Sequence, residues 1–400
     1  MNQKPTYEEL EKKIAELEYE LKSTKKYGLV WDKEDTKEDV VLQCENNIPV
    51  LIQDKSKKIV LNEGENNILI EGDNYHVLTA LNFIAKESID VIYIDPPYNT
   101  GREDFIYNDN SDDGYLHSKW LSFMEKRLSL AKQLLKSNGI ICISIDDHEQ
   151  ANLKLLCDKI FGKSNFIAQM IWKSKSGGAN DSASIASDHE YILTYAKLIT
   201  KIKVNKDTKA TVTTCYNQKD ENGKYSLDRL DKQSLGYHES LDFPIIGPDG
   251  KKYIVQHKDL NNRKARWRWS KETIEQRYNE LVFKWPFVYT KNYEKKDGQT
   301  PRSILFDERF GRTRTGSTDL KSIIGNQNIF NYPKPVNLVK YIISICSSNN
   351  GTILDFFAGS GTTGQAVMEL NKEDGGHRRF ILCTNNENGI CENVTYPRLK

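Results

Sequence analysis

The sequence predicts an α/β fold in which helices cover a largely parallel sheet and a long insert interrupts the chain. Short apolar runs alternate with segments of helical apolar spacing from about residue 67 to 200. The same alternation resumes after residue 330. Between these parts, the chain is rich in Lys, Tyr, Asn and Gly, and its strand patterns are irregular. Since strands that alternate with helices are typical of parallel sheets, the two flanking parts are expected to form one domain.

Composition excludes several classes of protein. The 400 residues include 57 Lys and Arg against 56 Asp and Glu, so the net charge of +1 indicates no partner by itself. With 38% hydrophobic residues, the chain can bury a core and is not a disordered protein. No apolar run reaches the roughly 18 residues of a membrane span, and the N-terminus lacks the apolar stretch of a secretory signal. The seven cysteines contain no Cys-x-x-Cys, so no disulfide framework and no metal site is expected. These features predict a soluble, cytoplasmic protein.

The N-terminal segment, residues 1–27, has the apolar spacing of an amphipathic helix. Its apolar residues are spaced by three and four: Tyr7, Leu10, Ile14, Leu17 and Leu21. Such a seam fits a coiled-coil arm that would form a homodimer, and it fits equally a helix lying on its own domain. Both interpretations stay open. Residues 28–66 are expected to form an extension that leads into the first strand.

The elements expected in residues 67–200 follow from apolar patterns. The expected strands are 68–70, 89–94, 140–145, 166–172 and 189–196. The expected helices have inner faces at Leu78, Leu81 and Ile84, at Trp120, Met124, Leu128, Ala131 and Leu135, and between His148 and Phe161. In residues 331–400, the pattern predicts helices over 336–346 and 363–370 and strands over 353–355 and 380–383. The insert is expected to span residues 201–330.

The first chemically informative segment is Asp95-Pro96-Pro97-Tyr98, directly after the expected strand 89–94. The two prolines keep the backbone extended and cannot continue a helix. The turn therefore presents Asp95 and Tyr98 at the carboxyl end of a strand, where open α/β sheets bind ligands. A carboxylate, a rigid proline pair and an aromatic ring suit a flat base that carries an exocyclic amine. The same tetrapeptide could also be an ordinary turn that ends a strand.

The second informative segment is the glycine-rich turn Phe357-Ala358-Gly359-Ser360-Gly361 between a strand and a helix. Small residues let a ligand approach the backbone, and the helix N-terminus offers free N–H groups. The turn has neither the Gly-x-Gly-x-x-Gly fingerprint of dinucleotide-binding domains nor the lysine of a phosphate loop. An adenosine without a polyphosphate therefore fits it better than a dinucleotide does.

Together, these two segments resemble the S-adenosylmethionine-dependent DNA amino-methyltransferases, and their order resembles the permuted beta group of that family. Further segments resemble the modification subunits of type III restriction–modification systems, namely 99–101, 104–109, 143–147, 188–191 and 384–388. The resemblance covers about residues 67–200 and 330–400. It implies a permuted Rossmann-like methyltransferase sheet with an inserted target-recognition domain, and S-adenosylmethionine as the cofactor.

The resemblance also implies roles for individual residues. Asp95, Pro96, Pro97 and Tyr98 would be catalytic. The residues implied to bind the cofactor are Asp355, Phe357, Ala358, Gly359, Gly361, Glu387, Asp73 and Lys334. For Asp73, a plain helix N-cap is an equally good interpretation.

The chemistry of an exocyclic amine explains the catalytic motif. The lone pair of adenine N6 is conjugated into the ring, so accepting its two hydrogens at the Asp95 carboxylate and the Pro96 carbonyl would direct the lone pair toward the methyl donor. The base must be flipped out of the duplex, and Tyr98 could stack on it. A cytosine-N4 methyltransferase uses the same logic but more often carries Ser before the prolines, so Asp95 favours adenine. A subunit that binds DNA without catalysis is the alternative of another class.

A basic segment inside the insert indicates where DNA would bind. Residues 251–314 contain 17 Lys and Arg against 8 Asp and Glu, a local net charge of +9. Basic residues that alternate with aromatic ones suit contacts to phosphates and bases. The expected DNA-binding residues are Arg263, Arg266, Arg268, Arg312 and Arg314. The expected partners are double-stranded DNA, a second copy of the chain and a restriction subunit, and no membrane.

Overall fold

The chain folds into two compact units in the computed structural model. The described residues are 13–14, 31, 38–59, 67–101, 113–177, 185–210, 215–259, 261–294, 297–325 and 330–400. Unit 1 comprises residues 1–205 and 302–400, and unit 2 comprises residues 206–301. The expected helix over residues 1–27 lies outside the described residues except for Lys13 and Ile14, which are helical. The expected insert, 201–330, is longer than unit 2, because residues 201–205 and 302–330 belong to unit 1.

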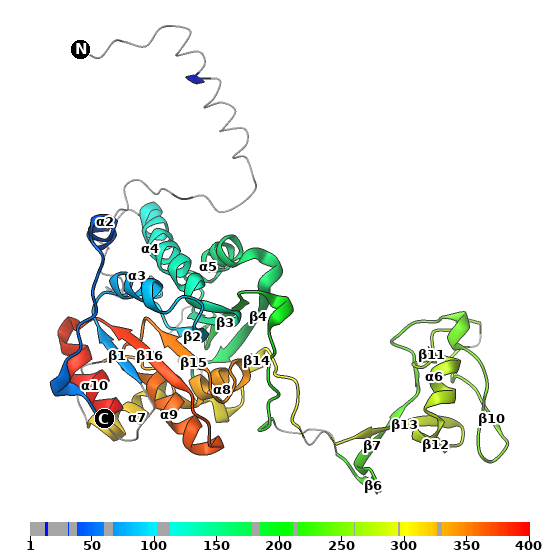
Figure 1. Cartoon of the computed structure of the whole chain (residues 1–400). Coiled ribbons are helices and arrows are strands. Elements are labelled where there is room, and N and C mark those ends of the chain that lie inside the picture. Colours follow the sequence, from blue (N-terminus) through cyan, green and yellow to red (C-terminus); the bar gives the residue numbers. More distant parts are fainter. Residues whose placement is uncertain are drawn as a thin grey trace. The chain divides into compact units, whose positions relative to one another are not determined.

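Unit 1 is built on an eight-stranded sheet (Figure 1). In spatial order, the strands are β1 (Ile68–Glu71), β16 (Arg379–Thr384), β15 (Thr352–Asp355), β2 (Ile89–Ile94), β3 (Leu135–Ile145), β5 (His189–Ala196), β4 (Phe166–Lys173) and β14 (Ile304–Leu305). The five strands from β1 to β3 are parallel, as the alternating pattern predicts.

The strand β5 differs from that expectation, because it runs antiparallel to both of its neighbours, β3 and β4. The reason lies in the connection between β4 and β5. Residues 174–188 are rich in Ser and Gly and carry no helical pattern. A parallel pair needs a crossover that is usually a helix, whereas an antiparallel pair does not.

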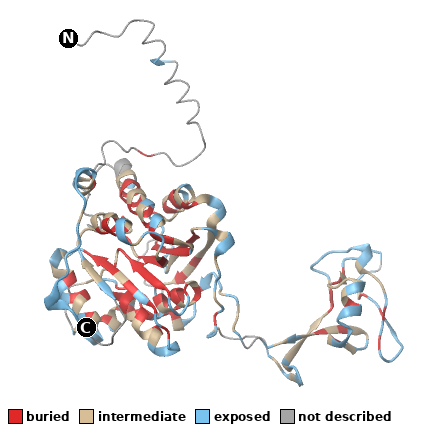
Figure 2. Cartoon of the chain, in the orientation of Figure 1, coloured by how far each residue is buried: buried red, intermediate tan, exposed pale blue. Residues whose placement is uncertain are grey.

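Helices cover both faces of this sheet, and each face has its own apolar core. One core contains α3 (Asn74–Ile84), α4 (Asp113–Leu134) and α5 (Gln150–Cys157), and the other contains α8 (Val336–Cys346) and α9 (Thr362–Asp374). Neighbouring residues of β2 divide between the two cores, Val91 on one side and Ile92 on the other, as the alternation of a strand requires. Figure 2 shows the buried residues concentrated in the sheet and the inner faces of its helices. The expected inner residue Ile84 is instead 73% exposed, because it is the last residue of α3.

The order of the strands places the two informative turns side by side. The C-terminal strands β15 and β16 lie between β1 and β2, although β1 and β2 are the first two strands of the sequence. Ile353 and Leu354 of β15 pair in parallel with Val91 and Ile92 of β2. The turn that follows β15 therefore lies next to the turn that follows β2, at the carboxyl ends of both strands.

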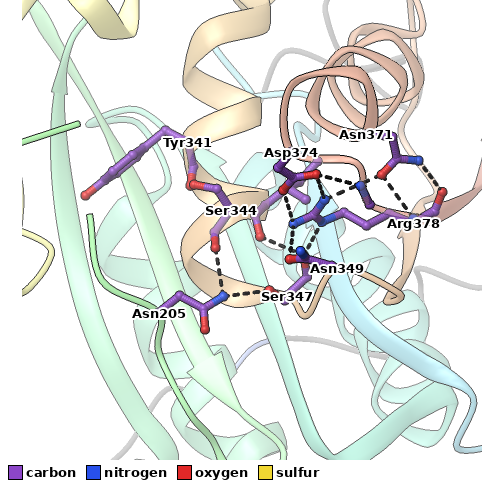
Figure 3. A network of polar contacts seen from close by, with 10 residues as sticks. Asn205, Tyr341, Ser344, Ser347, Asn349, Asn371, Asp374 and Arg378 are labelled. Carbon is purple, nitrogen blue, oxygen red and sulfur yellow. Dashed lines mark hydrogen bonds and ion pairs between the residues drawn. The ribbon is translucent and has the colours of Figure 1, made fainter. Parts of the chain in front are cut away.

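A buried arginine holds the start of β16 at the end of α8, and the same end of α8 also holds the residue from which the chain leaves unit 1 (Figure 3). The guanidinium of Arg378 donates hydrogen bonds to Asp374 and to the side-chain oxygens of Ser347 and Asn349. The Nδ2 of Asn205, the last residue before unit 2, donates to the backbone carbonyls of Ser344 and Ser347. The end of α8 thus holds both the start of β16 and the start of the insert.

Unit 2 has its own small core and an antiparallel sheet. The sheet order is β12 (Leu281–Lys284), β13 (Phe287–Tyr293), β7 (Gly223–Arg229) and β6 (Gln218–Asp220). Shorter pairs join β8 (Asp231–Lys232) to β11 (Arg266–Trp267) and β9 (Ile245–Ile246) to β10 (Lys252–Tyr253). Leu230, Tyr253, Trp267 and Val288 are buried in this core. Across both units, none of the helices that the structure describes is long and apolar enough to cross a membrane.

Candidate functional site

One pocket of unit 1 brings the two informative turns together. It has a volume of about 1300 Å³. Its walls include most of the residues to which the sequence assigned a catalytic or cofactor role, namely Asp73, Asp95, Pro96, Pro97, Tyr98, Lys334, Asp355, Phe357, Ala358, Gly359 and Glu387. Gly361 does not line the pocket and lies behind the turn, where it begins α9. Segments more than 200 residues apart in sequence thus share one cavity.

The turn after β2 is held in place by side chains from α4 and the start of α5. The indole Nε1 of Trp120, which is fully buried, donates to the carbonyl oxygen of Pro97 at 2.7 Å. Asn99 adopts a positive φ of 59° and donates from Nδ2 to the buried carboxylate of Glu149 at 2.6 Å. These contacts fix the proline pair from both sides, so the turn is a rigid support for Asp95 and Tyr98.

The Asp95 carboxylate accepts hydrogen bonds from two side chains. Lys334 Nζ lies 2.8 Å from Oδ1 and 2.9 Å from Oδ2. Tyr98 Oη lies 2.9 Å from Oδ1 and 3.0 Å from Oε2 of Glu190. Burial lowers the pKa of the Lys334 ammonium, but the charges of Asp95 and Glu190 outweigh it and raise that pKa to about 12. Lys334 therefore carries a positive charge directly at the Asp95 carboxylate, whereas the sequence assigned it only a role in binding the cofactor.

The glycine-rich turn forms a cradle at the start of α9. Gly361 is the N-cap of α9 with φ of 80°, and Gly359 has φ of 48°. A Cβ atom added at Gly359 would lie 3.0 Å from the ring of Phe330, which also lines the pocket. Only glycine combines this backbone conformation with so close an approach. The cradle and the helix N-terminus fit a ligand that carries a carboxylate and an adenosine.

Asp355, at the end of β15, is buried beneath this turn. It accepts hydrogen bonds from the backbone N–H of Phe357 at 2.9 Å and from Thr363 Oγ1 at 2.5 Å. Burial raises the pKa of Asp355 to about 7, and the charge of Asp95 acts in the same direction against the lowering effect of these hydrogen bonds. Asp355 thus holds the turn and also titrates near neutral pH.

The remaining two acidic residues to which the sequence assigned a cofactor role follow β1 and β16. Asp73 is the N-cap of α3 and accepts from the N–H of Tyr75 at 2.7 Å, as the alternative interpretation of this residue expected. Glu387 lies in a short 3-10 turn after β16, and its Oε2 accepts from Asn385. Both carboxylates line the pocket, so the N-cap role of Asp73 does not prevent a contact with a ligand.

The arginines expected to bind DNA have different surroundings. Arg263 is exposed and pairs with Asp242 at 3.0 Å. Arg268 pairs with Asp228 and donates to Thr290. Arg266 lies on β11, and its Nε is buried without a partner among the described residues.

The other two expected arginines lie in unit 1, at the start of α7 (Thr313–Ile324). Arg312 is buried and donates to the backbone carbonyls of Phe306, Asp307 and Gly311. Its guanidinium is therefore engaged in holding the chain before α7. Arg314 is exposed in the first turn of the helix. Arg314 is thus the more accessible of the two.

Sequence reasoning gave no role to three residues that shape the site. Glu190 of β5 contacts both Tyr98 and Lys334. Arg127 of α4 is fully buried and donates to Asn74 and Glu38, which supports the wall near Asp73. Glu149 holds Asn99. In the sequence, such a residue is recognisable only as a charge at an inward position of an otherwise apolar strand or helix. Its role could not be inferred, because its partners lie far away in the sequence.

Comparison with known proteins gives a consistent result. Residues 89–394 match the family model described as DNA methylase. The type III restriction–modification enzyme StyLTI Mod subunit of Salmonella typhimurium is 34% identical over 381 residues, which cover 85% of this chain and 56% of that protein. The type II methyltransferase M.KpnI of Klebsiella pneumoniae is 37% identical over 337 residues, 79% of each chain. The EcoPI Mod subunit of Escherichia phage P1 is 31% identical, over 82% of this chain and 58% of its own. The chain thus spans little more than half the length of these Mod subunits.

Proposed function

Because this chain belongs to the DNA methylase family, we propose that it transfers a methyl group from S-adenosylmethionine to the N6 amine of an adenine in DNA. The observation that carries the proposal is the single pocket in which Asp95, Pro96 and Tyr98 face the glycine cradle of residues 357–361. A site for an amine and a site for an adenosine ligand in one cavity are what direct methyl transfer requires, since donor and acceptor must meet without an intervening group.

The residues of the pocket have distinct roles in this proposal. The bound cofactor would supply an electrophilic methyl group on a sulfonium. Gly359 leaves room for the cofactor beside Phe330, and Asp355 holds the turn from below. Asp95 and the Pro96 carbonyl would accept the two hydrogens of the target amine, and Tyr98 would stack on the base. Trp120 keeps the proline pair in position for this contact.

The same reasoning extends to the substrate and to partners. Unit 2 contains the Arg266–Trp267 strand within the basic segment 251–314, and we propose that it recognises double-stranded DNA. The similarity to Mod subunits supports a role as the modification component of a restriction–modification system, acting in the cytoplasm where the DNA lies. A restriction subunit and a second copy of the chain are then the proposed partners.

One experiment tests the reaction and the recognition together. The purified full chain is incubated with cofactor and with genomic DNA that lacks methyl marks, and the DNA is then sequenced for modified bases. We expect N6-methyladenine within one short recognition sequence. N4-methylcytosine instead would assign the other amine as the target. Binding of DNA and cofactor without any modified base would overturn the proposed activity in favour of a non-catalytic specificity subunit.

A further inference from the structure

The catalytic carboxylate of Asp95 shares its positive partner with a second carboxylate. Lys334 Nζ contacts both oxygens of Asp95 and also lies 3.3 Å from Oε2 of Glu190. The three groups come from separate parts of the fold: Asp95 follows β2, Glu190 belongs to β5, and Lys334 precedes α8. Their side chains are only 27%, 16% and 10% exposed. We call these three residues the charge triad.

Tyr98 links the same two carboxylates. Its hydroxyl lies within 3.0 Å of both Asp95 and Glu190, yet it has only one hydrogen to donate. The Lys334 ammonium lies 4.9 Å from the centre of the Tyr98 ring. The two carboxylates therefore share one ammonium and one hydroxyl hydrogen. A hydrogen bond that one carboxylate loses can form to the other carboxylate.

This arrangement bears directly on the proposed chemistry. In the proposed methyl transfer, the carbon–nitrogen bond would form as the sulfur–carbon bond breaks. The cofactor would leave as a neutral thioether, and the target nitrogen would carry the positive charge until it loses a proton to solvent. A negative Asp95 stabilises that charge. An ammonium held by Asp95 alone would neutralise the carboxylate and oppose the charge that develops beside it.

We propose that Glu190 is a positioning residue that acts as the second counter-ion of Lys334, so that Asp95 keeps a net negative charge toward the target amine. The inference rests on the proposed function. With Glu190 present, the charge triad carries a net charge of −1. Without Glu190, the remaining pair is neutral, and Lys334 is free to settle wholly on Asp95.

Other titratable groups face the charge triad. Tyr93 lies beneath it, and burial raises its pKa well above the usual value, with further contributions from Asp95 and Glu190. Burial raises the pKa of Tyr98 in the same way, so both phenols stay neutral at physiological pH. Asp355 lies on the cofactor side, and its pKa of about 7 reflects burial and the charge of Asp95. Asp355 can therefore report on the effective charge of Asp95 without any reaction.

The test is a double-mutant cycle on single-turnover methylation. Glu190→Gln should lower the rate by about 100-fold, the size typical of removing one preorganised electrostatic group. Lys334→Met leaves the two neighbouring carboxylates without their counter-ion, which favours protonation of one of them, so it should also slow the reaction. The double variant restores the net charge of −1, so we expect its rate to lie within about tenfold of the parent rate, far above the product of the two single effects. Glu190→Asp keeps the charge and should retain most of the rate.

A matched control uses another ion pair of the same residue types in unit 1. Lys197 Nζ lies 2.8 Å from the carboxylate of Glu87, which is largely exposed and lies outside the proposed site. Glu87→Gln and Lys197→Met should leave the rate unchanged singly and together. Rates for Glu190→Gln equal to the parent rate would overturn the proposal, and so would a double variant that is as slow as the product of its single variants.

A second readout separates this inference from the proposed activity. If the parent chain transfers no methyl group, the proposed function fails, but the pH dependence of the melting temperature still reports on Asp355. Burial and the Asp95 charge raise the pKa of Asp355 to about 7. Glu190→Gln should move the Asp355 transition to lower pH, because Lys334 then shields Asp95 more fully, and Lys334→Met should move it to higher pH. Unmoved transitions in both variants would refute the shared counter-ion.

Discussion

At the scale of single residues, the properties of the pocket depend on the positions of its charged side chains. Asp95 and Asp355 lie at the ends of neighbouring strands, and the burial of Asp355 was not evident from the sequence alone. The sequence identified Asp95 from its place directly after a strand, and it identified Asp355, the last residue of β15, only through the resemblance to a known family. It did not identify Lys334 as the partner of Asp95, since 239 positions separate them and only the strand order brings them together.

The first prediction concerns Asp95. Asp95→Asn keeps the size of the side chain but removes the charge that, in the proposed function, faces the target amine. We expect methyl transfer to fall by about 1000-fold, the upper end of the range for removing one electrostatic group, while cofactor affinity stays within about twofold. Single-turnover rates and titration calorimetry measure the two quantities. A variant that methylates DNA within a few-fold of the parent rate would show that another group accepts the hydrogens of the target amine.

The second prediction concerns Asp355 and pH. Burial raises the pKa of Asp355 to about 7, above its usual value of 3.8. Because the folded chain favours the protonated form, this contribution to stability is fully present below about pH 4 and is lost as the pH rises through about 7. Asp355→Asn cannot ionise, so the gap in melting temperature between the variant and the parent should shift in favour of the variant from pH 5 to pH 8. A constant gap would show that Asp355 does not titrate in this range.

At the scale of elements, the sequence predicted most of unit 1. The strands β2 and β5 and the helix α8 have the bounds that the apolar patterns gave. Those patterns are strong because a central strand is buried on both sides, and because a helix that covers the sheet buries one complete face. The direction of β5 was not predictable, since an apolar run does not encode whether its partner is parallel. In unit 2, strands of two residues such as β8 and β11 are too short for any period to emerge.

The third prediction concerns the turn between β15 and α9. A side chain at Gly359 would approach the Phe330 ring and enter the pocket, so Gly359→Asp should weaken cofactor binding by about 100-fold or more, equivalent to ~2.7 kcal/mol. Gly375 provides a matched control, because it also has a positive φ, of 68°, but a Cβ atom there meets open space. Gly375→Asp should therefore show the backbone strain without the loss of affinity. Equal cofactor affinity in the parent and in Gly359→Asp would show that this turn does not bind the cofactor.

At the scale of the whole molecule, the order of strands explains how the site is assembled. The turn after β2 comes early in the sequence and the glycine-rich turn after β15 comes late, with unit 2 between them in the sequence. The insertion of β15 and β16 between β1 and β2 makes the two turns neighbours. Unit 2 can therefore interrupt the chain without interrupting the pocket, and Asn205 is held by the end of α8 where the chain leaves unit 1.

The last prediction concerns the binding of DNA by the full chain. If the basic segment neutralises phosphates, the logarithm of the affinity should fall linearly with the logarithm of salt concentration, with a slope of about −0.9 per phosphate. The Nε atoms of Arg266 and Arg268 are both buried without a partner among the described residues, but Asp228 and Thr290 hold the two terminal nitrogens of Arg268. Arg266→Ala should therefore reduce the slope by about 1, and Arg268→Ala by less.

Lys291 pairs with Asp220 at 2.6 Å, so Lys291→Ala serves as a control that removes one charge already neutralised within unit 2. Fluorescence anisotropy at several salt concentrations measures each slope, with cofactor affinity expected to stay constant. An Arg266→Ala variant that keeps both the affinity and the slope of the parent would place the DNA-binding surface on other residues than the Arg266–Trp267 strand.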